Sequence, residues 1–335
     1  MDSEIKEILY KRYNFNKLKN LIYKNNNSKA YEYLINKYNI TNKEEKIILY
    51  HILHLDYSQY FNKLGNFNLV TSLYNEKRIS RALELLLCLS MNLKNLYISK
   101  IYIIHEFYPN KGVQENMNLI SETIYLLKDM SNIHIEYIYE RPSFEYLFDF
   151  CNKYVKENAI ISNSDIIYDT TLSKINDLNE DHFLCISRNN KSIVDNKIKW
   201  NTIKLLCNTQ YVDNIFSQDT WVFKTPMKYP IKININLGEM FCDSYLNFKL
   251  SKSPYKCYNL SRDINCFHIQ EGESTSEIVS KDKSLIDKKI HQLYEKENGN
   301  TNILYGLKIN SVNDFNNNIN SNQFLNFQDY IKDFY

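Results

Sequence analysis

A regular alternation of strand-like and helix-like segments constrains the fold of this chain more than any other feature of its sequence. Residues 67–75 form an apolar, β-branched run, a helix-like stretch follows at 79–92, and a second apolar run follows at 98–106. Short apolar runs predict buried strands, whereas apolar residues three to four positions apart predict amphipathic helices. The segment therefore reads as strand, helix, strand.

The alternation continues toward the middle of the chain. A helix is expected at 118–129, a strand at 133–139, a helix at 143–155 and a strand at 159–168. Strands separated by helices of this length predict a mainly parallel, Rossmann-like sheet with helices on both faces, which is an α/β fold.

Sheets of this kind bind ligands at the carboxyl ends of their strands. The residues that follow each predicted strand are therefore the first candidates for a functional site. They are Thr71 to Asn75, His105 to Glu106, Glu140 to Arg141 and Asn163 to Asp165.

Composition excludes several classes of function. The 335 residues include 6 glycines and contain neither a GxGxxG nor a GxxxxGK[ST] motif, which argues against dinucleotide-binding and P-loop readings. The formal net charge is +2 with both signs interspersed, so no basic field would recruit nucleic acid. The hydrophobic share of 44% is typical of a folded chain.

The cysteines and the hydropathy pattern indicate a compartment. The seven cysteines are scattered without a CxxC pair, which favours reduced core thiols over a disulfide framework or a zinc site. No apolar run reaches the roughly 18 to 20 residues of a membrane span, and the charged N-terminus does not resemble a secretory signal. We expect a soluble, cytosol-like location, without membrane insertion.

Three regions are expected along the chain. Residues 1–64 have helical periodicity and predict an accessory helical module, residues 65–271 hold the sheet, and residues 272–335 form a helical or irregular extension. The N-terminal module is expected to pack against the next domain or against a second copy, giving a homodimer. Docking of an acceptor is its alternative role.

The segment AIISNSDIIYDTTL brings an apolar strand to Asn163, Ser164 and Asp165. An acid at such a strand end, beside an Asn, can hold a divalent cation that keeps open positions for diphosphate oxygens. Asp165 is the candidate ligand. The alternative is a turn in which the Asp caps a helix.

The order of seven further segments carries a family resemblance. In chain order they are SLYNEKR, ERPSFEYLFDF, NSDIIYDTTL, CISR, SQDTWVFKTP, LGEMFCDSYLNFKL and NLSRDINCFHIQ. This order is similar to nucleotide-sugar glycosyltransferases of the GT-A fold, and in particular to glycosyltransferase-like proteins of large DNA viruses of amoebae. The resemblance covers about residues 66–271.

The resemblance implies a metal site. Asn163 to Asp165 fall at the family's Asp-x-Asp motif, where Asn163 replaces the first Asp and offers a neutral carbonyl or binds the sugar. Asp165 remains the metal ligand, and His268 falls where the fold supplies a further one. An imidazole ligand favours Mn²⁺ over Mg²⁺. The alternative for His268 is a hydrogen-bonded core histidine.

The resemblance also implies an acceptor side. Asp219 would lie at the floor of the site and Trp221 beneath a sugar ring, although a strand-entry Asp and a core Trp are the alternatives. Glu239 and Asp243 are spaced i,i+4 in a predicted helix, which puts both carboxylates on one face. Asp243 falls near the family's general base and Glu239 would contact the acceptor. A solvated helix face is the alternative.

The donor side comes from the remaining positions. Thr71, Tyr74, Asn75 and Arg78 lie where the fold holds base and ribose, and Arg141 resembles an element beside the nucleobase. Arg188 would approach the diphosphate or the sugar. The alternative for each arginine is an ordinary surface residue.

Taken together, the resemblance implies a Mn²⁺-dependent transferase, with Mg²⁺ as second choice. It would move a hexose, glucose or galactose, from a UDP-sugar to a hydroxyl of a glycan or glycosylated protein, on a virion or a collagen-like protein. A viral protein of this kind would act in the host cytoplasm or viral factory. The alternatives are a sugar- or nucleotide-binding protein without turnover and a nucleotidyltransferase, whose Gly-rich loop is missing.

Overall fold

The computed structural model describes ten segments of the chain. They are residues 27–53, 63–107, 118–128, 130–176, 178–190, 215, 217–269, 283–297, 304–318 and 324–326. Their centre is a seven-stranded sheet in the order β3-β2-β1-β4-β8-β6-β9. Its strands are β1 (Phe67–Leu73), β2 (Ile98–Glu106), β3 (Ile133–Ile138), β4 (Glu157–Ser162), β6 (His182–Ser187), β8 (Gln218–Thr225) and β9 (Lys256–Tyr258).

The sheet is parallel except at β8. Strands β3, β2, β1 and β4 pair in parallel, β8 is antiparallel to both of its neighbours, and β9 is parallel to β6. Neighbouring residues of a strand point to opposite faces, and Leu69 and Val70 of β1 accordingly enter two different core clusters.

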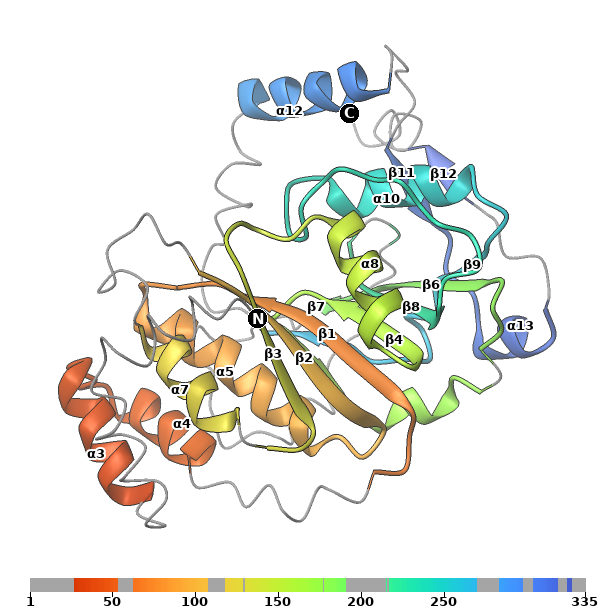
Figure 1. Cartoon of the computed structure of the whole chain (residues 1–335). Coiled ribbons are helices and arrows are strands. Elements are labelled where there is room, and N and C mark those ends of the chain that lie inside the picture. The colour runs from red at the N-terminus through yellow and green to blue at the C-terminus, as the bar shows by residue number, and fades with distance from the viewer. Residues whose placement is uncertain are drawn as a thin grey trace.

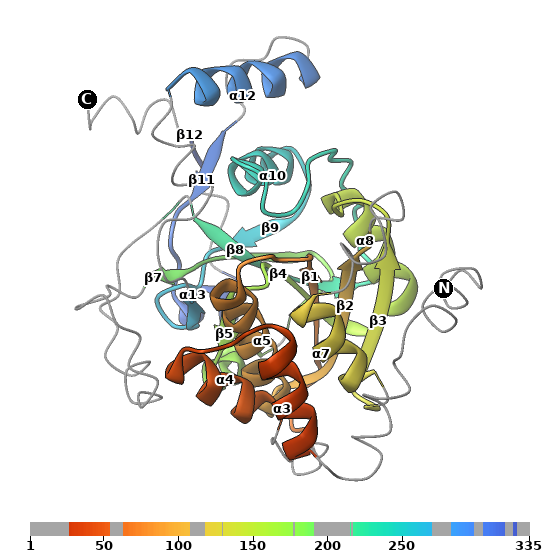
Figure 2. The same ribbon diagram turned by 90° about the vertical axis from the view of Figure 1, so that its left-hand side faces the viewer.

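Helices cover both faces (Figures 1 and 2). On one face lie α5 (Ile79–Lys94) and α7 (Leu119–Leu127), and on the other lie α8 (Phe144–Tyr154) and α10 (Cys242–Ser251). The expected α/β fold class, with a mainly parallel sheet between helices, is therefore confirmed.

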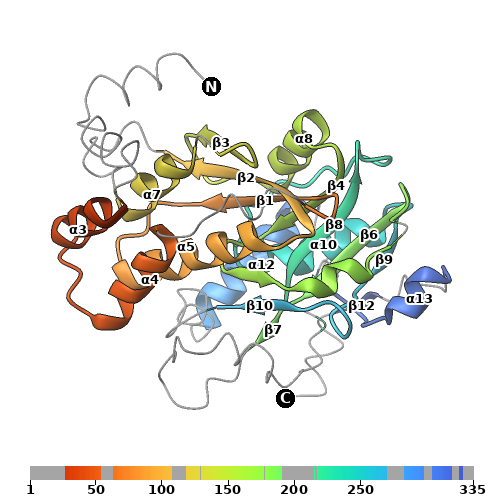
Figure 3. The same ribbon diagram turned by 90° about the horizontal axis from the view of Figure 1, so that it is seen from below.

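A second, three-stranded sheet lies below the first in the view of Figure 3. It contains β5 (Ile166–Tyr168), β10 (Cys266–His268) and β7 (Asn189–Asn190). The single strand expected at 159–168 is thus two strands in different sheets, because the chain turns at Ser164 and Asp165. The 3-10 helix η2 (Thr170–Lys174) follows β5.

The N-terminal helices share the core of the sheet. Helices α3 (Asn27–Lys37) and α4 (Lys43–Leu53) are helical as expected, and Leu34 and Leu49 are buried in one cluster with Leu69 of β1. The side chain of Asn42 accepts a bond from the Glu45 amide and caps α4. Residues 1–26 and 54–62 of the expected module lie outside the described residues.

Elements near the C-terminus pack on the same body. These are α12 (Lys283–Lys296), β11 (Tyr305–Leu307), α13 (Val312–Asn316) and β12 (Phe324–Asn326). Leu293 and Leu307 are buried in the cluster beneath α10, and Phe315 is buried in the other cluster. Of the helices in the described part of the chain, none has the length and hydropathy that a membrane span requires.

Truncation of one leucine tests whether the N-terminal helices fold with the sheet. Leu49→Ala is expected to lower the free energy of unfolding by about 2 to 5 kcal/mol, because the side chain is fully buried. Ile47→Ala, on the exposed side of the same helix, should change it by less than about 0.5 kcal/mol. Urea denaturation should show one transition for both variants. An extra early transition in Leu49→Ala would make residues 1–64 a separate folding unit.

Candidate functional site

The main sheet brings three polar positions to one edge. Because β8 runs against its neighbours, the ends of β4 and β6 meet the beginning of β8. Asn163 and Arg188 follow the first two strands, and Asp219 lies at the start of the third. Backbone bonds close this edge, from the Asn163 amide to the Asp219 carbonyl at 3.1 Å and from the Arg188 amide to the Ser217 carbonyl at 3.0 Å.

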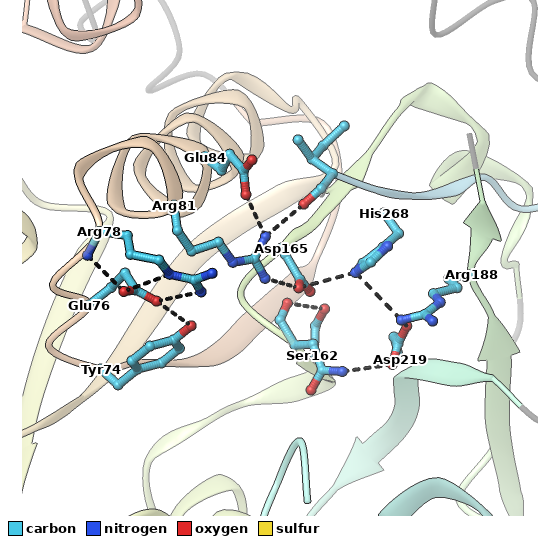
Figure 4. A network of polar contacts seen from close by, with 12 residues as sticks. Tyr74, Glu76, Arg78, Arg81, Glu84, Ser162, Asp165, Arg188, Asp219 and His268 are labelled. Carbon is cyan, nitrogen blue, oxygen red and sulfur yellow. Dashed lines mark hydrogen bonds and ion pairs between the residues drawn. The ribbon is translucent and has the colours of Figure 1, made fainter. Parts of the chain in front are cut away.

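The small sheet brings His268 to Asp165. Strands β5 and β10 pair antiparallel with His268 opposite Ile166, and the Ile269 amide donates to the Asp165 carbonyl at 2.9 Å. This register places His268 Nε2 3.2 Å from Asp165 Oδ2, as Figure 4 shows. Two residues separated by 103 positions, both expected as metal ligands, are therefore neighbours.

Arg81 of α5 also contacts Asp165, a contact that the sequence patterns did not predict. Its Nη2 donates to Asp165 Oδ2, and its Nη1 donates to Glu84 Oε2 at 2.6 Å and to the Ile269 carbonyl at 3.0 Å (Figure 4). Arg81 lies in the first turn of the helix that follows β1, at the carboxyl edge of the sheet. This position is the sequence feature that could have predicted the contact.

The Asp165 carboxylate is charged but incompletely satisfied. Burial favours its neutral form, yet His268 and Arg81 hold the pKa of Asp165 well below its usual range. Arg81 and His268 both contact Oδ2, whereas Oδ1 is buried without a hydrogen-bond partner among the described residues. A buried carboxylate oxygen without a partner is costly, and it marks a position where a cation or donor would be stabilised.

Asp219 is held by two donors. Asn163 Nδ2 donates to Asp219 Oδ1 at 2.6 Å, and Arg188 Nη1 donates to Oδ2 at 3.1 Å. The same Arg188 nitrogen lies 3.4 Å from His268 Nε2, so the contacts from Arg81 to Asp219 form one chain (Figure 4). Burial raises the pKa of Asp219, and Arg188 opposes the shift.

Asp243 completes the acidic side of the site. It lies in the first turn of α10, where helix amides stabilise negative charge. Burial, together with the charge of Asp219, nevertheless raises the pKa of Asp243 to about 7. A carboxylate with a pKa near neutrality is suited to accept a proton.

Arg141 lies close to Gly238 and Asn163. Gly238 has φ +70, and a Cβ at this position would lie 2.6 Å from Arg141 Nη2 and 3.8 Å from Asn163 Oδ1. The glycine thus permits both a left-handed backbone and the approach of the guanidinium. Arg141 therefore lies near the segment Asn163 to Asp165.

The end of β1 holds the remaining donor-side candidates. Thr71 is buried, and its Oγ1 has no hydrogen-bond partner among the described residues. The side chain of Asn75 accepts bonds from Asn118 Nδ2 and Ser121 Oγ. Tyr74 Oη donates to Glu76 at 3.4 Å, and the more exposed Arg78 also pairs with Glu76.

Trp221 does not present a ring to solvent, which corrects its expected position beneath a sugar. Its side chain is 0% exposed, and its ring packs edge-on against Phe144 with centroids 4.8 Å apart. Successive side chains of a strand point to opposite faces of the sheet, and Trp221 of β8 points into the core beneath α8. The core alternative therefore holds for this residue.

Glu239 and Asp243 do not share a helix face, contrary to expectation. The helix begins at Cys242 because Phe241 adopts a left-handed backbone with φ 64. Glu239 lies before the helix, where it accepts from the Asn236 amide and pairs with Lys289 of α12. Despite burial, Lys289 lowers the pKa of Glu239. The carboxylate is thus directed toward α12.

Comparisons with known proteins found likenesses among solved structures. No protein-family model and no curated protein matches the chain. Among solved structures, the chain is similar to GalNAc-T7 with UDP, GalNAc and Mn²⁺, at 12% identity and a TM-score of 0.37 over 62% of this chain and 44% of that chain. It is also similar to S. aureus TarS 1–349, at 10% identity and a TM-score of 0.31 over 62% of this chain and 59% of that chain. The matched region thus spans about half the length of these two structures.

Proposed function

We propose that this chain is a glycosyltransferase that transfers a hexose, glucose or galactose, from a UDP-sugar to a hydroxyl group. The observation that carries the proposal is the meeting of Asp165, His268, Asp219 and Asp243 at the carboxyl edge of the sheet. Asp165 and His268 offer ligands for a cation. Asp243, beside Asp219, offers a carboxylate with a pKa near 7. A site with these two parts is suited to a reaction in which a diphosphate leaves and an acceptor hydroxyl attacks.

The pair of Asp165 and His268 fits a Mn²⁺ ion. Asp165 Oδ2 and His268 Nε2 lie 3.2 Å apart, so a carboxylate oxygen and an imidazole nitrogen would be available to one cation. The partnerless Oδ1 of Asp165 offers a further oxygen. Within the described segments, no group of three His, Cys, Asp or Glu residues is arranged to hold a metal ion. Diphosphate oxygens and water would supply the further ligands of such an ion.

A bound Mn²⁺ would supply positive charge to the leaving diphosphate. The chain itself contributes the other roles. Arg188 and Arg141 would bind the diphosphate or sugar, with Arg188 oriented by its bond to Asp219. Asp243 would take the proton of the acceptor hydroxyl, and Asp219 would raise the proton affinity of Asp243. Asn163 would position Asp219 through its 2.6 Å bond.

The donor and acceptor sides extend from this centre. Thr71, Tyr74 and the segment up to Arg78 would hold the nucleoside, as the end of β1 adjoins Asp165 through Arg81. The acceptor proposed is a hydroxyl of a glycan or of a glycosylated protein, including a virion or collagen-like protein. Asp219 stays the acceptor-side carboxylate, and Glu239 would act there only if it left Lys289.

Two observations favour a second candidate function. Arg81 already neutralises Asp165, and Asn163 replaces the acid that the Asp-x-Asp pattern has. Both features reduce the negative charge available for a cation. A sugar- or nucleotide-binding protein that uses this site without turnover is therefore the alternative.

A panel of UDP-hexoses tests the two candidates. Purified chain is expected to release UDP from UDP-glucose or UDP-galactose with Mn²⁺ present and no acceptor, since water can replace the acceptor hydroxyl. Addition of EDTA should stop the release. UDP release should be measured alongside calorimetric binding. Binding of a UDP-sugar without release, with and without glycan acceptors, would favour the binding protein, and neither binding nor release would contradict both candidates.

A further inference from the structure

A buried acid links the N-terminal helices to the body of the protein. Glu122 lies in the first turn of α7 and is 2% exposed. Lys37, in the last turn of α3, forms an ion pair with Glu122 Oε1, across 85 positions of sequence. Figure 2 shows α3 beside α7 on the same side of the sheet. The positive charge that contacts this buried carboxylate therefore comes from a helix that the sequence suggested was accessory.

The same turn of α7 holds the loop at the end of β1. Asn118 caps α7 by accepting from the Ser121 amide at 3.0 Å. Asn118 Nδ2 and Ser121 Oγ both donate to Asn75 Oδ1, at 2.9 and 3.0 Å. The Asn75 side chain is thus bound by the turn that contains Glu122.

Asn75 belongs to the loop 74–78, which leads into the residues of the site. Within this loop the Glu76 amide donates to the Tyr74 carbonyl, and the Arg78 amide donates to Glu76 Oε1. Arg78 then precedes α5, whose first turn carries Arg81 against Asp165. A displacement of α7's first turn would therefore change the shape of the loop at the proposed nucleoside end.

We propose that Lys37 is a positioning residue for this loop, so that the seating of α3 on α7 controls the affinity for the nucleotide. The nucleotide part of this inference rests on the proposed function. A buried carboxylate that has lost its cation is strongly unfavourable, so loss of Lys37 would drive Glu122 toward solvent. Because Glu122 and Asn118 share one turn, that movement weakens the bonds to Asn75. Anything that displaces α3 would act on the loop in the same way.

Four variants isolate this effect. Lys37→Met removes the positive charge, and Lys37→Arg keeps it. The double variant Lys37→Met with Glu122→Gln removes both charges, so no unpaired ion remains. Lys29→Met is the matched control, because Lys29 is an exposed lysine of the same helix.

Amide hydrogen exchange of residues 74–78 is the first readout, since it requires no ligand. Lys37→Met is expected to speed this exchange by about tenfold, while exchange in β4 stays unchanged because the opening is local. The double variant, Lys37→Arg and Lys29→Met should exchange at the parental rate. The second readout is the Kd for UDP by calorimetry, expected to rise by about tenfold in Lys37→Met and to recover in the double variant.

The outcomes separate the inference from the proposed function. Parental exchange of residues 74–78 in Lys37→Met, or equal acceleration throughout the sheet, would overturn the positioning role. Faster local exchange with an unchanged Kd would overturn the control of nucleotide affinity. If the parental protein binds no UDP, the proposed function fails, while the exchange experiment still decides whether Lys37 positions the loop.

Discussion

Replacement of Asp165 by Asn is expected to lower sugar transfer by about 10²- to 10³-fold, the range for loss of a preorganised electrostatic contact at a developing charge. The variant keeps the shape of the side chain but loses the charge that would hold a cation beside His268. Arg81 retains Glu84 and the Ile269 carbonyl as acceptors, so the fold should persist. Initial rates with UDP-hexose and Mn²⁺ measure the effect.

Metal titrations complete this experiment. The parental protein should lose activity in EDTA and regain it best with Mn²⁺, because an imidazole ligand disfavours Mg²⁺. Calorimetry with Mn²⁺ and UDP should show a metal-dependent gain in UDP affinity that Asp165→Asn lacks. Asp149→Asn, on the exposed side of α8, serves as the matched control. Parental activity of Asp165→Asn in EDTA would rule out the metal assignment.

Asp243→Asn is expected to slow transfer by about 10²- to 10⁴-fold, as general-base loss does, with UDP binding retained. Because the pKa of Asp243 is raised to about 7, the parental kcat/KM should rise as pH increases through 7 and level above it. The variant should lose that rise. The pH profile of Asp219→Asn should lie at lower pH than the parental profile, because the charge of Asp219 contributes to the raised pKa of Asp243.

Thermal stability gives a second readout for the same carboxyl group. An unfolded Asp has a pKa of about 3.9, so between pH 4 and 7 the folded state binds more protons at Asp243 than the unfolded state does. Stability therefore falls as pH rises through this window. Asp243→Asn should have a higher Tm than the parent at pH 8 and a similar Tm near pH 4. An unchanged rate and unchanged Tm would make Asp243 an ordinary helix residue.

The anomeric configuration of the product, determined by NMR, must accompany the rates, since a retaining reaction requires no such base.

Local patterns were sufficient to predict most of the sheet. The expected strand at 98–106 coincides with β2, and the helix expected at 143–155 coincides with α8 within one residue at each end. These predictions succeeded because the period of apolar residues reflects which face of an element is buried. The strand expected at 159–168 was wrong because apolar residues continue on both sides of a turn, and only the pairing partners distinguish β4 from β5.

The sequence by itself determined the α/β architecture and the candidate residues that follow the strands at the carboxyl edge of the sheet. Only the tertiary structure decided which candidates meet: it joined Asp165 to His268 and Asp219 to Arg188, buried Trp221 and turned Glu239 toward Lys289. It also brought Arg81 against Asp165, and it made the N-terminal helices part of the core. The physical reason is that periodicity records burial along one element, whereas ion pairs depend on strand register and on how distant segments pack.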